Sequence, residues 1–234
     1  MQIFYAPDIS GSTYTLDENE SKHLISVLRM SKGAEVKLID GKGNLYTGII
    51  EDPDQKKCTI GISAEIKDFE KRNYSLHIAI SPLKNPERFE WFIEKSVEIG
   101  VDEITPIICK NTEKPGIKTQ RINNLIISAM KQSLKAKKTV FNESCTFSEF
   151  IKTQTGNYRM IAHCNPAINR KSISEVCPKN ESSVILIGPE GDFTAEEISQ
   201  ASGNGYIPIH LGSSRLRTET AGVAACHSVY FINQ

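Results

Sequence analysis

The chain has 234 residues, of which 39% are hydrophobic and 24% charged, a balance that is typical of folded globular proteins and excludes a disordered chain. Its 28 basic and 28 acidic side chains cancel, which excludes attraction of a nucleic acid by the overall charge, so any such partner needs a local basic patch. The first residues carry no secretory signal, and no run approaches the roughly 18 apolar residues of a membrane span. We therefore expect a soluble, cytoplasmic protein without membrane contacts.

Six cysteines are spread along the chain without a C-x-x-C pair, and no two histidines stand four residues apart. Such short spacings are typical of zinc sites, and disulfides need an oxidising compartment. The sequence therefore predicts free thiols and no metal site.

Short runs that alternate apolar and polar residues predict strands in the first part of the chain, at residues 14–16, 35–40, 45–51 and 58–66. Turn-forming residues separate these runs, among them Asp40-Gly41 and Asp52-Pro53. A helix around residues 18–28 interrupts them. We expect a small antiparallel barrel or sandwich.

The pattern changes after the charged segment 69–73, where strands and helices begin to alternate, as in an α/β domain. We place the boundary so that residues 1–71 form the first domain and residues 72–234 the second. Strands are predicted in the second domain at residues 75–80, 102–109, 159–164, 184–187 and 206–211. A helix is expected to begin after Asn85, as N-cap, and to end at Gly100.

A second helix, predicted at residues 119–136, has an apolar stripe on one face and basic residues on the other. Against one acid, Glu113, the stretch from 110 to 140 carries eight basic residues: Lys110, Lys114, Lys118, Arg121, Lys131, Lys135, Lys137 and Lys138. This asymmetry favours a phosphate-binding patch. A solvated helix face is the alternative.

Two glycine-containing segments near the C-terminus follow buried strands. In the first glycine loop (188–193), Gly-Pro-Glu-Gly is followed by Thr194 and Glu197, whose spacing predicts a capping box at the start of a helix. In the second glycine loop (212–220), Gly212 ends a strand and a Ser/Thr-rich stretch opens the next helix. Ligands bind at this edge of open α/β sheets, so the two loops together predict a site for one cofactor.

Phosphate-binding motifs do not account for these loops. The chain has no G-x-x-x-x-G-K-[ST], and G-P-E-G-D-F is not G-x-G-x-x-G. The alternative for either loop alone is a strand-to-helix turn that uses glycine for its backbone freedom.

The sequence LIGPEGDF, followed by HLGSSRLRTETA, resembles the paired C-terminal motifs of the 16S ribosomal RNA uridine-N3 methyltransferases, the RsmE group of the SPOUT superfamily. HLISVLRMSKG (23–33) and EKSVEIGVDEITPI (94–107) resemble other parts of that family, so the similarity extends over essentially the whole chain.

This resemblance implies a PUA-like RNA-binding domain, a SPOUT-type α/β methyltransferase domain with a deep trefoil knot, S-adenosylmethionine as cofactor, and a homodimer. The partner it implies is 16S ribosomal RNA of the small ribosomal subunit. The residues expected to bind the cofactor are Leu186, Ile187, Gly188, Pro189, Glu190, Gly191, Leu211, Gly212, Ser213, Leu216, Arg217, Thr220 and Ala221.

Methylation of uracil at N3 requires that the N3 proton leaves and that the resulting anion is stabilised. Arg215 and Arg217 are the candidate catalytic donors to the uracil oxygens, and Glu219 is the candidate that accepts the proton or orients an arginine. An ordinary salt-bridged loop is the alternative for these three.

Reaching N3 requires an unpaired or flipped-out uridine, which the protein has to hold by its backbone. The residues expected to contact RNA are His23, Arg29, Lys84, Arg88, Lys131 and Lys135. Lys131, Lys135 and Gln2 depart from residues that are common in the family, which affects the expected RNA contacts more than the cofactor site.

A different class of function remains open, namely a non-catalytic RNA-binding or ribosome-assembly factor with the same fold. A small α/β enzyme that uses a nucleotide cofactor is disfavoured, because the chain lacks the phosphate-binding motifs.

Overall fold

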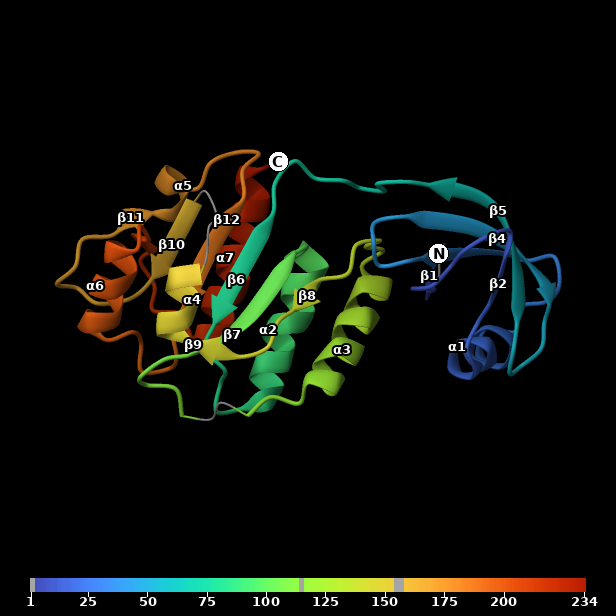
Figure 1. The fold of residues 1–234 in the computed structure, drawn as a ribbon, viewed down its shortest axis with the longest axis horizontal. Helices are drawn as coiled ribbons and strands as arrows, with labels where there is room; N and C mark the ends of the chain where they lie inside the picture. The colour runs from blue at the N-terminus through green and yellow to red at the C-terminus, as the bar shows by residue number, and fades with distance from the viewer. Residues whose placement is uncertain (1–2, 114–115, 154–157) are drawn as a thin grey trace. The chain divides into compact units, whose positions relative to one another are not determined.

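The computed structural model describes residues 3–113, 116–153 and 158–234. The chain divides into two compact units, Met1–Lys71 with Ile127–Lys138, and Arg72–Ile126 with Thr139–Gln234 (Figure 1). One junction between the units lies between Lys71 and Arg72. The segment 127–138, which we expected in the second domain, groups with the first unit.

The first unit contains a five-stranded sheet. Its order is β1 (Ile3–Tyr5), β3 (Glu35–Ile39), β4 (Leu45–Asp52), β5 (Thr59–Ile66) and β2 (Thr13–Thr15). The four predicted strands all form, and β1 is an addition, since three residues are too few to show a pattern. The predicted strands pair in antiparallel fashion, as expected, and the added β1 pairs with β3 in parallel, so the sheet as a whole is mixed.

The predicted helix around residues 18–28 forms in two parts, α1 (Glu18–Lys22) and a π-helical turn, η1 (His23–Val27). Asp17 caps α1, since its side chain accepts the Glu20 N–H at 2.8 Å. Arg29 follows the last turn with a positive φ of 56°. This left-handed conformation lets the chain leave the helix and return to the sheet.

The helix α3 (Thr119–Gln132) is shorter than the predicted span 119–136. The chain turns at Leu134, which has a φ of 60°, a conformation that an α-helix cannot contain. Beyond it, the Ala136 carbonyl accepts the Gly43 N–H at 3.1 Å, and the Lys138 N–H donates to the Gly41 carbonyl at 2.9 Å. These hydrogen bonds explain why the segment 127–138 belongs with the first unit.

The second unit contains an eight-stranded sheet whose strand pairs are all parallel. Its order is β11 (Lys171–Ser172), β13 (Ile207–His210), β10 (Tyr158–Ala162), β12 (Ser183–Ile187), β6 (Leu76–Ile80), β7 (Glu103–Ile108) and β8 (Val140–Phe141), and β9 (Cys145–Thr146) also pairs with β7. All five predicted strands form. Since the strands are parallel, their carboxyl ends lie at one edge of the sheet.

Helices connect these strands, as the α/β pattern predicts. The predicted helix α2 (Pro86–Ile99) is capped by Asn85 and ends at Gly100, where φ is 113°. The capping box of Thr194 and Glu197 opens α6 (Ala195–Gly203), and α7 (Thr218–Ile232) follows the second glycine loop. Two short helices, α4 (Phe147–Thr153) and α5 (Ile173–Val176), are additions to the prediction.

Both faces of the parallel sheet are covered. Side chains of α4 and α6, such as Phe150 and Ile198, pack in one apolar cluster with Ile161 and Leu186 of the sheet. On the other face Gly222 of α7 meets Phe92 of α2 closely. The predicted α/β class is confirmed, and in the described parts of the chain no helix is long and apolar enough to cross a membrane.

Candidate functional site

The sheet order brings the two glycine loops to one place. The first follows β12 and the second follows β13, and β10 lies between these two strands. The three strands are parallel, so both glycine loops and the segment after β10, which begins at His163, leave the same edge of the sheet. In parallel α/β sheets this edge is where ligands bind.

Hydrogen bonds join the first glycine loop to its neighbours. The Cys164 N–H, in the segment after β10, donates to Asp192 Oδ2 at 2.7 Å. The Asn111 side chain, after β7, donates to the carbonyl oxygen of Asp192 at 3.0 Å. The Lys84 N–H, after β6, donates to Glu190 Oε1 at 3.2 Å. The loop is thus held by segments that follow three other strands.

The glycines of the two loops differ in the space that surrounds them. A Cβ on Gly188 would lie 3.0 Å from the Phe193 ring, and one on Gly191 would lie 3.2 Å from Cβ of Asn111, so both positions are close to protein atoms. Gly212 has a φ of 124° and no atom within 4 Å of the place a Cβ would take. Of the three, Gly212 leaves open space beside the backbone.

The residues expected to bind the cofactor divide by exposure. Leu186, Ile187, Gly188 and Pro189 are buried at the end of β12, and Leu211, Leu216, Thr220 and Ala221 are half-buried, whereas Glu190, Gly191, Gly212, Ser213 and Arg217 are exposed. The half-buried leucines and the open side of Gly212 offer an apolar surface and backbone groups to a flat ligand. These groups fit the flat adenine ring of a nucleoside cofactor.

The three catalytic candidates lie at the same edge. Arg215 and Arg217 are exposed, while Glu219 is buried with 7% of its surface exposed in the first turn of α7. Arg88 Nε, from the first turns of α2, lies 3.9 Å from Glu219 Oε1. The N-terminus of α7 and the Arg88 side chain therefore both place positive charge beside the Glu219 carboxylate.

Several of the basic residues that were expected to bind RNA or phosphate form ion pairs with acids from other segments of the chain. Ion pairs join Lys84 to Glu113 at 2.7 Å, Arg121 to Glu90 at 2.7 Å and Lys135 to Glu70 at 3.7 Å, and Lys131 also pairs with Glu20. Three of the eight basic residues in the stretch from 110 to 140, namely Arg121, Lys131 and Lys135, are thus paired with acids from outside it. Lys114 and Gln2 lie outside the described residues.

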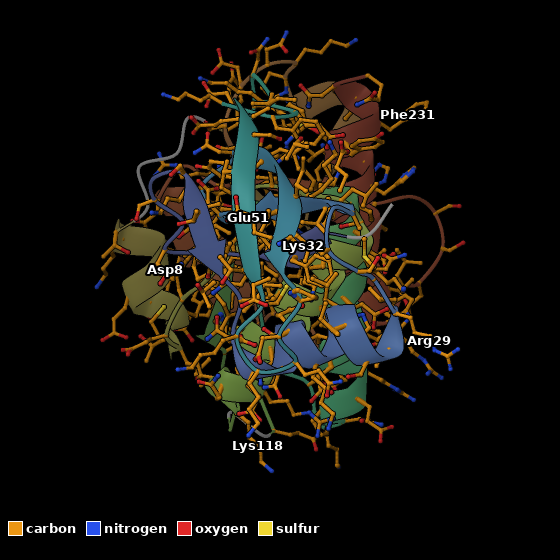
Figure 2. All side chains as sticks on the ribbon, turned by 90° about the vertical axis from the view of Figure 1, so that its right-hand side faces the viewer. Asp8, Arg29, Lys32, Glu51, Lys118 and Phe231 are labelled. Carbon is orange, nitrogen blue, oxygen red and sulfur yellow. The ribbon has the colours of Figure 1, made fainter. Side chains whose placement is uncertain are left out.

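Besides Lys131 and Lys135, two RNA-contact candidates belong to the first unit, His23 and Arg29. His23 is exposed in η1, and Arg29 is exposed at its left-handed position. Figure 2 shows the Arg29 side chain extending outward from the end of that helix. Nothing in these positions prevents either side chain from meeting a ligand.

Sequence reasoning missed Asn111 and Asp192, which hold the first glycine loop. Each is a short polar residue directly after a strand or in a glycine turn, a signal that is common in turns and therefore weak. Within the ranges that the structure describes, no three His, Cys, Asp or Glu side chains gather so as to hold a metal ion.

Two protein-family models match the chain. A model described as an RNA methyltransferase domain matches residues 70–230, and one described as an RNA methyltransferase PUA domain matches residues 16–63. The chain belongs to this RNA methyltransferase family. The resemblance carried by the paired glycine loops is thereby confirmed.

Related proteins have similar sequences over most of the chain. A protein of Mesomycoplasma hyopneumoniae is 31% identical over 177 residues, covering 73% of this chain and 75% of that one. A protein of Buchnera aphidicola is 28% identical over 238 residues, covering 96% and 90%. Both are named ribosomal RNA small subunit methyltransferase E.

Solved structures share the fold. A probable rRNA-methyltransferase from Porphyromonas gingivalis is 39% identical with a TM-score of 0.93, covering 100% of this chain and 98% of that one. A ribosomal RNA small subunit methyltransferase E from Neisseria gonorrhoeae, solved bound to S-adenosyl methionine, is 26% identical with a TM-score of 0.89, with the same coverage.

Proposed function

We propose that this protein is an enzyme that transfers the methyl group of S-adenosylmethionine to N3 of a uridine in 16S ribosomal RNA of the small ribosomal subunit. The observation that carries the proposal is that β10 alone separates β12 from β13, which brings both glycine loops to one edge of the sheet. The relatives named as small-subunit methyltransferases, one of them bound to S-adenosyl methionine, support it.

We assign the two parts of the reaction to the two domains expected from the sequence. Residues 1–71 would bind RNA as a PUA-like domain, a role supported by the PUA match. Residues 72–234 would carry the methyl transfer, in a SPOUT-type domain whose trefoil knot remains a prediction from the resemblance. His23 and Arg29, both exposed, are the proposed RNA contacts of the first part.

The proposed cofactor site uses the ends of β12 and β13. Leu211 and Leu216 would pack against the adenine ring, and the open side of Gly212 would let the main chain approach it. The exposed Glu190, already bonded to the Lys84 N–H, would lie at the rim of this site. When bound, the cofactor supplies an electrophilic methyl group on a sulfonium, which needs no general acid.

The catalytic residues act on the acceptor base. The N3–H bond breaks and the N3–methyl bond forms, so the negative charge that develops on the uracil oxygens needs a positive partner. Arg215 and Arg217 are exposed and therefore available to donate to these oxygens. Glu219 is our candidate for accepting the proton or orienting an arginine.

The proposal is tested by binding and by methylation. We expect calorimetry to show binding of S-adenosylmethionine, and small subunits from a strain that lacks this protein to gain methyl groups at one uridine when they are incubated with it. Arg217→Ala should fold and lose most of this activity, about 100-fold for a donor to developing charge, with Lys152→Ala, which removes an exposed cation of α4, as the control. A non-catalytic assembly factor would bind RNA without the cofactor, and unchanged turnover in Arg217→Ala would remove that residue from the mechanism.

We further propose that the protein acts in the cytoplasm as a homodimer. Phe231 of α7 is 70% exposed and Tyr230 is 36% exposed, and the Phe231 ring stacks on His227 beside Ile173 of α5. Figure 2 shows Phe231 extending outward from its helix. A second copy would cover this apolar surface. Phe231→Glu should lower the molar mass in light scattering to that of a monomer, and a monomeric wild type would contradict the proposal.

A further inference from the structure

The first glycine loop owes its shape to contacts from outside it. Within the loop, the Asp192 N–H donates to the Pro189 carbonyl at 2.9 Å, which closes a tight turn. Such a turn of four residues is not stable alone, so the surrounding segments have to hold it. Two side chains make these contacts: Asp192, within the loop, accepts the Cys164 N–H, and Asn111, outside it, donates to two loop carbonyls.

Asp192 stands at a position where the backbone itself favours glycine. Its φ is 62°, in the left-handed region that Asp and Asn tolerate better than other residues with a side chain. Its carboxylate uses both oxygens, since Oδ1 accepts the Phe193 N–H at 2.8 Å and Oδ2 accepts the Cys164 N–H at 2.7 Å. The second bond joins the first glycine loop to the segment after β10, which lies between the two glycine loops.

Asn111 holds the loop from the side of β7. Its amide nitrogen donates to the carbonyl oxygens of Gly191 at 3.3 Å and of Asp192 at 3.0 Å. Gly191 makes this approach possible, because a Cβ there would lie 3.2 Å from Cβ of Asn111. Both carbonyl oxygens therefore have a hydrogen-bond donor within the protein itself.

We propose that Asp192 and Asn111 are positioning residues that fix the first glycine loop, relative to the segment after β10, in the conformation that binds the cofactor. This inference rests on the proposed function. The free enzyme then already has the binding conformation, so binding energy is not spent on ordering the loop. Neither residue has to touch the cofactor.

The test measures cofactor affinity and turnover separately. Asp192→Gly keeps the left-handed backbone and removes both carboxylate bonds, while Asn111→Ala removes the donor on the other side. We expect each to raise the Kd for S-adenosylmethionine in calorimetry by about 10- to 100-fold, the effect of losing about two hydrogen bonds. The kcat at saturating cofactor should change by less than about threefold, because ligand binding restores the loop.

Two further variants serve as controls. Asp192→Asn keeps the tolerance for positive φ and one acceptor oxygen, so it should restore part of the affinity lost in Asp192→Gly. Glu196→Gln, an exposed acid in the first turn of α6, should bind like the wild type. A merely structural role would lower the Tm equally with and without cofactor, whereas a positioning role reduces the rise in Tm that saturating S-adenosylhomocysteine produces.

The outcomes separate the two proposals. A wild type that binds no S-adenosylmethionine removes the proposed function. A wild type that binds, together with an unchanged Kd in Asp192→Gly and Asn111→Ala, overturns the positioning role alone. A loss of kcat without a change in Kd also overturns it, and if Asp192→Gly does not fold, Asn111→Ala decides.

Discussion

Gly222 allows α7 to pack against α2 and the sheet, and a single methyl group tests this packing. A Cβ on Gly222 would lie 2.5 and 2.6 Å from two carbons of the Phe92 ring and 3.1 Å from Cδ1 of Ile80. Phe92 and Ile80 are both fully buried, so neither can move into solvent. The added methyl group therefore has to displace the helix or the ring.

The cost follows from two opposing effects. Overpacking a core costs about 1–3 kcal/mol, and two contacts under 3 Å put Gly222→Ala near the upper end. The greater helix propensity of alanine offsets about 1 kcal/mol of this loss. We expect a net loss of about 2 kcal/mol, which lowers the Tm by roughly 4–8 °C in a chain of this size.

The assay compares two identical substitutions. Thermal and urea unfolding, followed by circular dichroism, are measured for Gly222→Ala and for Gly203→Ala, at the end of α6, where a Cβ would meet no atom within 4 Å. Gly203→Ala should be neutral or stabilise by about 0.5–1 kcal/mol, because alanine restricts the unfolded chain. If Gly222→Ala is as stable as the wild type, or both variants lose the same amount, the packing argument is refuted.

Three other predictions follow from buried or paired groups. The Glu197 carboxylate accepts the N–H groups of Thr194, in the capping box, and of Lys110. Glu197→Ala should therefore lower the free energy of unfolding by about 3 kcal/mol in urea titrations, whereas Glu196→Ala, at the exposed neighbour, should lower it by less than about 0.5 kcal/mol. Burial raises the pKa of the Cys226 thiol to about 12. In the unfolded chain this thiol ionises near pH 8.5, so above that pH the folded state holds more protons, the free energy of unfolding should fall as the pH rises, and Cys226→Ala should show a smaller slope. Lys131 pairs with Glu20 and is also an expected RNA contact, so Lys131→Ala should destabilise the protein by about 1 kcal/mol and lower the slope of the salt dependence of RNA affinity by about one; an unchanged slope would exclude the phosphate contact.

Signals that act within a few residues predicted the local structure. Asn85 and Gly100 mark the ends of α2, and Thr194 with Glu197 marks the start of α6, because each cap satisfies backbone groups that are close in the sequence. The strands of both units were found for the same reason. The elements that were missed are short: β1, β8, β9, β11 and the helices α4 and α5 have too few residues to show a period.

The candidate site was predictable only in part. The sequence motifs predicted both glycine loops and the arginines of the second, because a glycine turn after a buried strand can be recognised in the sequence. Asn111 and Asp192 were not predictable, since their partners come from segments about 80 and 28 residues away. The ion pairs of Lys131 with Glu20 and of Lys135 with Glu70 were not predictable for the same reason, because these acids are far along the chain, and the phosphate-binding patch stays a prediction.

The sequence by itself determined the class of the protein, both ends of α2, the start of α6 and the residues of the two glycine loops, because these depend on interactions between near neighbours. The tertiary structure decided which strands are adjacent, and hence that β10 alone separates β12 from β13 at the proposed site. It also decided which charges are neutralised and that residues 127–138 join the first unit. Strand order and ion pairing depend on contacts between distant residues, and a linear pattern does not contain that information.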